Sequence, residues 1–206
     1  DAPIRTLSGG MQQRALIATA LICDPALVIL DEPTTALDVT VEAEILDLFS
    51  ELRQSVHAGV LFISHNIAVI AKMCDRIGAL YAGELVELGA TEAVLREPRH
   101  PYTRALLAAR IAFGTAKAEM ALAAGDPALL EAGRAAGGCA FAPHCAVAQP
   151  RCRVEAPPLA AVAPDRVSRC FFHATLPAWA PAPRRGAAAP PLAENATLLE
   201  VRLRGI

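Results

Sequence analysis

Lysine is almost absent from this chain of 206 residues, in which Lys72 and Lys117 are the only two. Neither lysine stands in a G-x-x-x-x-G-K-[ST] phosphate loop, so this sequence contains no motif of that kind for cradling the β- and γ-phosphates of a nucleotide. Long apolar runs are absent too. The longest, ALIATALIC at 15–23, falls far short of the roughly 20 residues that a membrane-spanning helix needs. The net charge of -2 argues against a general nucleic-acid-binding protein.

We expect no signal peptide at the start of this sequence, because no basic segment precedes an apolar one there. The chain begins with Asp1 rather than methionine, and we interpret it as a segment of a longer protein. Its six cysteines favour a reducing compartment and metal or cluster chemistry over disulfides. Two of them, Cys23 and Cys74, lie inside helical patterns and are predicted to be packing residues.

The hydrophobic pattern predicts alternating helices and strands over the first third of the chain. The expected order is helix, strand, helix, strand and helix, at residues 8–22, 26–30, 39–58, 59–64 and 66–74. This alternation indicates an α/β fold with a parallel sheet, and both strands are apolar on both faces, as buried parallel strands are. A hairpin over 76–89 that turns at Ala82 and Gly83, and two further helical segments, are expected to follow.

Phosphate chemistry is indicated first by a helix start and a strand end. Ser8, Gly9 and Gly10 open the first helix, where free amides and the helix dipole favour an anion. Asp31 and Glu32 follow the first strand, so one carboxylate can hold Mg²⁺ through water while the other polarises an attacking water. Taken singly, each feature is more often a helix cap or a solvated strand end.

Two further features follow in the same order along the chain. Asp38, in TALD, precedes the second helix, and His65 follows Ser64 at the end of the second strand. The carboxyl ends of parallel strands meet at one edge of a sheet, so these side chains are expected near Asp31 and Glu32. A histidine after a strand is usually structural, but four such features in sequence favour one phosphate-binding site.

These segments, LSGGMQQR, LVILDEP, TALD and SH, resemble the signature, Walker B, D-loop and H-loop motifs of ATP-binding cassette (ABC) ATPases, over roughly residues 1–110. The resemblance implies a P-loop-type fold in which Asp31 is the Mg²⁺-side carboxylate, Glu32 the catalytic base and His65 a contact of the γ-phosphate. Asp38 would then lie at the seam of a dimer. The residues expected to bind ATP held by a partner subunit are Ser8, Gly9, Gly10 and Gln12.

The phosphate loop and the Gln-containing loop of such ATPases are missing from this sequence, and we expect them outside this chain. Positioning of the phosphates accounts for most of phosphoryl-transfer catalysis. The chain by itself is therefore predicted to bind ATP poorly and to hydrolyse none measurably. Asn66 is a mild departure, because an acidic residue often follows the histidine in this family.

The segment HPYTRALLAA at 100–109 resembles the segment that follows the hairpin in the ATPases of importers of oligopeptides, dipeptides and related solutes such as nickel. In that family this helix leads into a cysteine-bearing extension. The four cysteines that follow are Cys139, Cys145, Cys152 and Cys170. The resemblance implies that they hold a [4Fe–4S] cluster. The family usually has a Pro-rich stretch before the first of these cysteines, but this chain has GDPALLEAGRAAG there. This departure concerns how the extension docks on the ATPase domain rather than the cysteine ligands.

The spacing of the cysteines alone is less specific. Four thiolates suit Zn²⁺ or an iron–sulfur cluster, and the lack of a C-x₂₋₄-C pair favours the cluster. Unligated thiols in a tail are the remaining alternative. Residues 134–185 contain seven arginines and only two acids, and these arginines would offset the negative charge of a cluster. A nucleic-acid-binding tail is the competing interpretation of this composition.

We therefore expect four segments: part of an ABC ATPase domain at 1–110, a cysteine-bearing extension at 111–176, a Pro/Ala-rich linker at 177–197, and a strand at 198–206. The last is either the first strand of a second ABC domain or a terminal edge strand.

The expected function is ATP binding and hydrolysis, with Mg²⁺, to power import of dipeptides, oligopeptides or related solutes at the cytoplasmic face of a membrane. Expected partners are a second ABC subunit or domain in a head-to-tail dimer, transmembrane permease subunits and, indirectly, a solute-binding protein, but no nucleic acid. Two alternatives are a non-transport ABC ATPase of DNA repair or translation, and a non-catalytic redox or regulatory protein that uses the cysteines.

Overall fold

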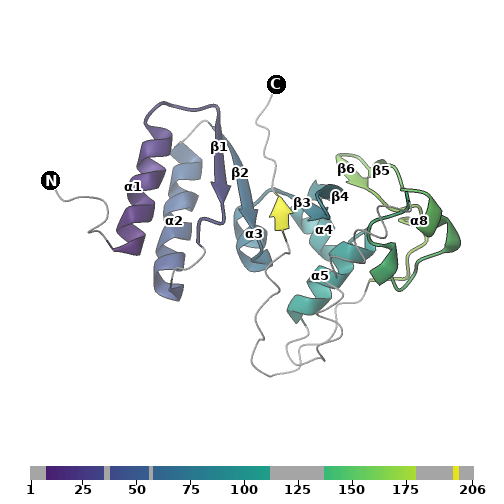
Figure 1. The fold of residues 1–206 in the computed structure, drawn as a ribbon. Helices are drawn as coiled ribbons and strands as arrows, with labels where there is room; N and C mark the ends of the chain where they lie inside the picture. The colour runs from purple at the N-terminus through teal and green to yellow at the C-terminus, as the bar shows by residue number, and fades with distance from the viewer. Residues whose placement is uncertain (1–7, 35–37, 56–57, 112–136, 180–196, 200–206) are drawn as a thin grey trace.

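A computed structural model describes residues 8–34, 38–55, 58–111, 137–179 and 197–199 (Figure 1). The strands form one seven-stranded sheet in the order β1-β2-β7-β3-β4-β6-β5. β1 (Leu27–Asp31) and β2 (Gly59–Ser64) are parallel, and the remaining neighbours are antiparallel. The α/β class predicted from the sequence is confirmed, but only β1 and β2 form the predicted parallel pair, and the sheet as described is mixed.

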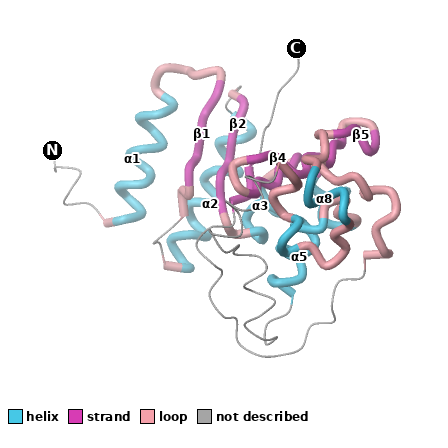
Figure 2. Tube along the Cα trace, turned by 45° about the vertical axis from the view of Figure 1, so that its right-hand side comes forward, coloured by secondary structure: helices cyan, strands magenta, loops and turns pink. Residues whose placement is uncertain are grey.

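Helices α1 (Gly9–Leu21) and α2 (Val39–Ser55) lie side by side next to β1 and begin where the sequence predicts (Figures 1 and 2). Ser8 caps α1, its hydroxyl oxygen accepting from the Met11 amide at 3.4 Å. The two helices pack closely at Gly10, where an added Cβ would come within 2.8 Å of a Val41 methyl carbon. Gly10 is therefore also a packing residue, a role that its place in the signature-like segment did not suggest.

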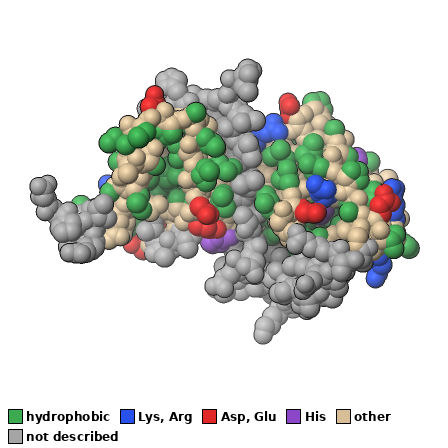
Figure 3. Space-filling view, turned by 45° about the horizontal axis from the view of Figure 1, so that its top comes forward, with side chains coloured by type: hydrophobic (Ala, Val, Ile, Leu, Met, Phe, Trp, Pro, Cys, Tyr) green, Lys and Arg blue, Asp and Glu red, His purple; other side chains and the backbone are tan. Residues whose placement is uncertain are grey.

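β1 is an edge strand whose side chains alternate between partly buried and exposed. Leu27 and Ile29 are 53% and 58% exposed, so the prediction that this strand is buried on both faces is wrong for the described structure. The reason is that none of the described elements covers this face, where apolar side chains gather over the part of the molecule formed by α1 and β1 (Figure 3). Among the helices that the structure describes, none has the length and apolar character required to cross a bilayer.

β3 (Arg76–Tyr81) and β4 (Glu84–Ala90) form the predicted hairpin. Its turn residues Ala82 and Gly83 both have positive φ, 54° and 76°, as a tight two-residue hairpin turn requires. α3 (Ile67–Met73), α4 (Thr91–Arg96) and α5 (Pro101–Ile111) complete this part. One hydrophobic core runs from α1 and α2 through Phe62 and the hairpin to Phe141.

Residues 137–179 attach to the hairpin as additional sheet. Their elements are the short 3₁₀ helix η2 (Ala142–His144), α8 (Pro150–Val154), β5 (Ala160–Ala163) and β6 (Arg166–Ser168). β6 pairs antiparallel with β4, with Ser168 opposite Glu87. The sequence did not predict these two strands, which are short and, in β5, consist of alanine and valine alone.

β7 (Thr197–Leu199) lies between β2 and β3, so the described part of the C-terminal segment is an interior strand rather than an edge strand. Most of the predicted linker and residues 200–206 lie outside the described residues, as does the beginning of the expected extension up to residue 136.

Candidate functional site

The ends of the two parallel strands bring Glu32 and His65 together. Asp31 pairs with Ile63 in the register of the sheet, and the Glu32 amide continues this pairing by donating to the Ile63 carbonyl at 2.9 Å. The Glu32 carboxylate oxygen Oε1 lies 2.8 Å from His65 Nδ1 and accepts from the His65 amide at 3.1 Å. Both side chains are partly exposed, 34% for Glu32 and 41% for His65, so the pair remains open to a ligand.

Glu32 adopts a left-handed backbone conformation, with φ of 47°. Such a φ is uncommon for a residue with a side chain. The following α3 is capped by Asn66, whose side-chain oxygen accepts from the Ala68 amide at 3.0 Å. The buried Ser64 hydroxyl accepts from the Asn66 amide at 3.0 Å. The departure at position 66 thus has a local role, because asparagine is among the best residues for starting a helix.

The other predicted nucleotide-site residues lie at the same side of the sheet, where α1 begins and β1 and β2 end (Figure 1). Asp31 is exposed at the end of β1, and Ser8 and Gly9 are exposed at the start of α1. The Asp38 carboxylate caps α2, accepting from the Thr40 amide at 3.1 Å and from the amide that follows at 3.0 Å. The expected roles of Ser8, Gly9, Gly10, Gln12 and Asp38 toward ATP on a partner remain predictions.

A second group of predicted residues converges in residues 137–179. All four of Cys139, Cys145, Cys152 and Cys170 line one small cavity of about 20 Å³. Phe141 also lines it, and His100 and Pro101 form its wall toward α5. The cavity thus gathers cysteines that are up to 31 positions apart in the sequence, from Cys139 to Cys170.

Backbone contacts hold these cysteines in place. The Cys139 amide donates to the Cys152 carbonyl at 2.8 Å, which joins the start of the segment to α8. Gly138 makes this approach possible, because an added Cβ there would lie 2.6 Å from the Arg153 carbonyl oxygen. The Cys145 amide continues the chain around the cavity by donating to the Ala142 carbonyl at 3.3 Å.

Burial, together with the charges of neighbouring cysteines, raises the pKa of three of these thiols. Burial raises the pKa of Cys145 and of Cys170 to about 11 each, and the neighbouring cysteines add to both shifts. The pKa of Cys139 is also raised, first by burial and then, among other causes, by the charge of Cys152. Cys139, Cys145 and Cys170 therefore need a positive centre nearby before they become thiolates at neutral pH.

Two arginines lie near the thiols. The Arg151 guanidinium lies 3.9 Å from the ring centre of Phe171, which lines the cavity, and pairs with Glu155 at 2.6 Å. Arg104 lowers the pKa of Cys170 as a minor cause that opposes its burial. Of these two, only Arg151 belongs to the arginine-rich residues 134–185, because Arg104 lies on α5.

Within the described residues, no group of three or more His, Cys, Asp or Glu side chains is drawn together closely enough to hold a metal ion. The four cysteines share a cavity without meeting at one point. As for the two remaining cysteines, Cys74 is buried as predicted, whereas Cys23 is exposed, so its prediction as a packing residue is wrong. α1 ends at Leu21, which leaves Cys23 in the turn that follows the helix.

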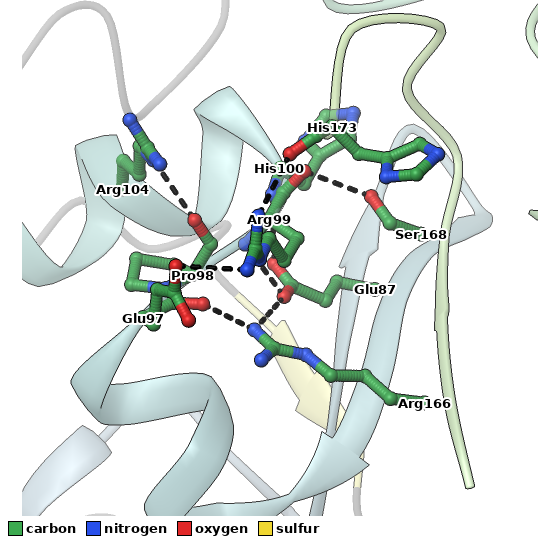
Figure 4. A network of polar contacts seen from close by, with 9 residues as sticks. All are labelled: Glu87, Glu97, Pro98, Arg99, His100, Arg104, Arg166, Ser168 and His173. Carbon is green, nitrogen blue, oxygen red and sulfur yellow. Dashed lines mark hydrogen bonds and ion pairs between the residues drawn. The ribbon is translucent and has the colours of Figure 1, made fainter. Parts of the chain in front are cut away.

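A buried polar network, which the sequence did not reveal, fastens the cysteine segment to the hairpin (Figure 4). The Glu87 carboxylate on β4 is fully buried and accepts from Arg166 Nη2 on β6 at 2.8 Å. It also accepts from the amides of Arg99 and His100 at 2.8 and 3.0 Å. The Ser168 hydroxyl donates to the Arg99 carbonyl at 3.0 Å, which clamps the segment before α5 between β4 and β6.

His100 links this network to the cavity. Its Nδ1 accepts from the Tyr102 amide at 3.0 Å, which caps α5. The side chain is 1% exposed, and burial lowers the pKa of His100 to about 3, so the ring is neutral near pH 7. The motif HPYT was the one sequence signal that pointed to this position.

Two protein families match separate parts of this chain. Residues 1–35 match the ABC transporter family, and residues 86–152 match the oligopeptide/dipeptide transporter C-terminal region. The first match covers the segment with the signature-like and Walker B-like motifs, so this segment is similar to part of an ABC transporter. The second match is to the C-terminal region of the oligopeptide/dipeptide type, so the resemblance found in the sequence is confirmed.

Three relatives illustrate the relationship. A Brucella ovis protein described as a peptide import ATP-binding protein is 48% identical over 171 residues, covering 80% of this chain and 50% of the relative. The dipeptide transport ATP-binding protein DppD of Escherichia coli K12 is 43% identical over 167 residues, 81% of this chain and 50% of the relative. The oligopeptide transport ATP-binding protein OppD of Salmonella typhimurium is 44% identical over 164 residues, 80% and 48%. The chain thus spans about half the length of the relatives it matches.

Proposed function

We propose that this chain is the part of an ABC ATPase that activates water against the γ-phosphate of ATP, within a protein that powers import of peptides or related solutes. The contact between Glu32 and His65 at the ends of two parallel strands is the observation that carries this proposal. The relatives, which are named as peptide, dipeptide and oligopeptide import or transport proteins, favour transport over DNA repair or translation.

We propose a distinct task for each of the three side chains. Glu32 is the general base that takes a proton from the attacking water, since its carboxylate is partly exposed and its orientation is fixed by His65. His65, through its other ring nitrogen, is left to contact the γ-phosphate. Asp31, exposed at the strand end, would hold Mg²⁺ through water, and that ion would offset the charge of the phosphates.

The start of α1 serves a different nucleotide. Ser8, Gly9 and Gly10 present the free amides of a helix start, where a phosphate is favoured, and Gln12 lies in the first turn. We propose that they complete the ATP site of a second ABC subunit or domain in a head-to-tail dimer, with Asp38 at the seam. We propose that the protein acts on permease subunits at the cytoplasmic face of the membrane, which use the energy of ATP hydrolysis for import. A solute-binding protein would contact the permease and thus be an indirect partner.

Replacing Glu32 with glutamine in the full-length protein tests the assignment. The amide keeps the shape but cannot accept the proton of water, so phosphate release should fall at least 100-fold while ATP binding persists. The matched control is Glu44→Gln, which removes a carboxylate from the exposed pair with Arg14 at 2.8 Å and should leave turnover unchanged. The isolated 206-residue chain should hydrolyse no ATP, and turnover by it would refute the requirement for a phosphate loop supplied from outside this chain.

We further propose that the four cysteines hold a [4Fe–4S] cluster, with Zn²⁺ as the alternative. The donor set fits, because four thiols, one buried and three partly buried, line one cavity next to arginines. A cluster also suits thiols that share a cavity without meeting at one point, since each thiolate binds a different iron, whereas the ligands of one zinc ion all lie about 2.3 Å from it. When bound, the cluster would supply one-electron chemistry or structural support.

Iron and sulfide assays on anaerobically purified protein test this assignment. The wild type should contain about four irons and four sulfides per chain, as expected for a [4Fe–4S] cluster. Cys152→Ser should lose most of them, whereas Cys23→Ser, which changes an exposed cysteine outside the cavity, should not. Stoichiometric zinc in place of iron would support the alternative, and neither metal would leave the thiols unligated.

A further inference from the structure

The side-chain amide of Asn66 makes two different contacts. Its oxygen accepts from the Ala68 amide at 3.0 Å and caps α3, while its nitrogen Nδ2 donates to Glu42 Oε1 on α2 at 3.5 Å. Both side chains are partly buried. Asparagine can make both contacts because its amide carries an acceptor and two donors, whereas an ionised aspartate only accepts. At a position where the family often has an acidic residue, this chain therefore has a donor that faces a carboxylate on α2.

The segment that carries His65 is held by two other parts of the fold. Glu32 Oε1 lies 2.8 Å from the His65 ring and accepts from the His65 amide at 3.1 Å. Asn66, the next residue along the chain, contacts α2 through Glu42. The first turn of α2 is fixed in turn, because the Glu42 amide donates to the Asp38 carbonyl at 2.8 Å. The position of His65 therefore depends on α2 as well as on the end of β1.

We propose that Glu42, through its hydrogen bond with Asn66, is a positioning residue that holds His65 in place for ATP hydrolysis. This inference rests on the proposed function of Glu32 and His65. Neither Glu42 nor Asn66 contacts the nucleotide in this proposal. The bond is long for a hydrogen bond, so a small displacement of α2 would break it and release the segment that carries His65.

The charges of the two side chains predict which substitutions break the contact and which restore it. Asn66→Asp keeps the cap of α3, because aspartate caps helices about as well as asparagine. It replaces the donor with a second carboxylate facing Glu42, and the two like charges repel each other. Adding Glu42→Gln removes the repulsion and places a donor on α2 opposite the new carboxylate. The pair then has the net charge of the wild type with donor and acceptor exchanged.

The test measures ATP turnover by the full-length protein as wild type, Asn66→Asp, Glu42→Gln and the double variant. The kcat is expressed per bound ATP analogue, so that unfolded protein does not count. Asn66→Asp should lower kcat about tenfold with an unchanged KM for ATP, since a misplacement of about 1 Å can cost about 100-fold. Glu42→Gln alone should change kcat little, because its carbonyl oxygen still accepts from Asn66. The double variant should recover kcat to within about twofold of wild type.

The matched control combines Asn66→Asp with Glu44→Gln, which removes the α2 carboxylate that pairs with Arg14 and should not restore kcat. An unchanged kcat in Asn66→Asp, a loss that Glu42→Gln does not restore, or equal recovery with Glu44→Gln overturns the positioning role. If the wild type hydrolyses no ATP, or Glu32→Gln keeps full turnover, the proposed function fails instead. The contact is then tested by urea denaturation, in which Asn66→Asp should lower the midpoint and the double variant should regain it. A midpoint that the double variant does not regain overturns the contact itself.

Discussion

Replacing Glu87 with glutamine removes a negative charge from the interior of the network that fastens residues 137–179 to the hairpin. Glu87 is fully buried and its guanidinium partner, Arg166, is 7% exposed. Glutamine has nearly the same size and keeps one carbonyl oxygen, so it can still accept from one backbone amide near α5. It cannot balance the charge of Arg166, whose Nη2 lies 2.8 Å from the carboxylate.

The magnitude follows from what is left unpaired. Breaking a buried ion pair by removing one partner destabilises a protein by about 3–5 kcal/mol, because the other charge stays desolvated. The amides of Arg99 and His100 both donate to the carboxylate, so one of them also loses an acceptor. Arg166 retains its hydrogen bond to the Glu97 carbonyl, which moderates the loss. We therefore expect Glu87→Gln to lower the free energy of unfolding by about 3–5 kcal/mol.

Urea denaturation of wild type, Glu87→Gln, Arg166→Met and the double variant measures this effect. In the double variant neither buried charge remains, so its loss of stability should be smaller than the sum of the two single losses by about 1–3 kcal/mol. The control is Glu92→Gln, which removes a carboxylate from an exposed pair with Arg96 on α4 and should barely move the midpoint. A loss below about 1 kcal/mol for Glu87→Gln, or strict additivity in the double variant, would refute the claim that this ion pair anchors the segment.

Two further changes probe the packing and the pH response. Gly10→Ala should lower the free energy of unfolding by about 1–3 kcal/mol in thermal or urea unfolding, because the new methyl group would lie 2.8 Å from a Val41 carbon. Adding Val41→Ala to the same chain should restore most of this loss. His100→Asn keeps an acceptor for the Tyr102 amide but removes the titrating ring. Burial lowers the folded-state pKa of His100 to about 3, below the unfolded value. The free energy of unfolding should therefore fall as the pH drops from about 6.5 toward 3, by about 1.4 kcal/mol per pH unit. The variant should lack this part of the pH dependence when unfolding is measured between about pH 5 and 6.5.

Local signals predicted the nucleotide side of the molecule well. Ser8 caps α1 and Asn66 caps α3 through bonds that span three residues or fewer, and the hairpin turn at Ala82 and Gly83 needs only two residues with positive φ. The approach of Glu32 to His65 was predictable because two adjacent parallel strands must end at the same edge of their sheet. Each of these features is encoded within a short segment or by a rule of sheet geometry.

The anchoring of the cysteine segment could not be predicted in the same way. Glu87 and Arg166 are 79 residues apart, and nothing near either residue marks it as buried or paired. β5 consists of alanine and valine, and alanine is depleted in strands, so its pairing depends on the neighbouring β6 rather than on its own sequence. The spacing of the cysteines predicted that they act together, but the packing of Tyr81 against Phe141 becomes evident only in three dimensions.

The two candidate sites therefore differ in what holds them, although they share one hydrophobic core. The Glu32–His65 contact depends on the register of β1 and β2 and on the backbone at the strand ends, which are close in space by construction. The thiol cavity depends on contacts that join distant segments, through Glu87 on β4 and Tyr81 on β3. Both of these residues belong to the same hairpin, and their side chains contact the cysteine segment at separate points. Losing the Glu87 network should thus loosen the thiols while the strand ends stay paired, because no bond of that network involves β1 or β2.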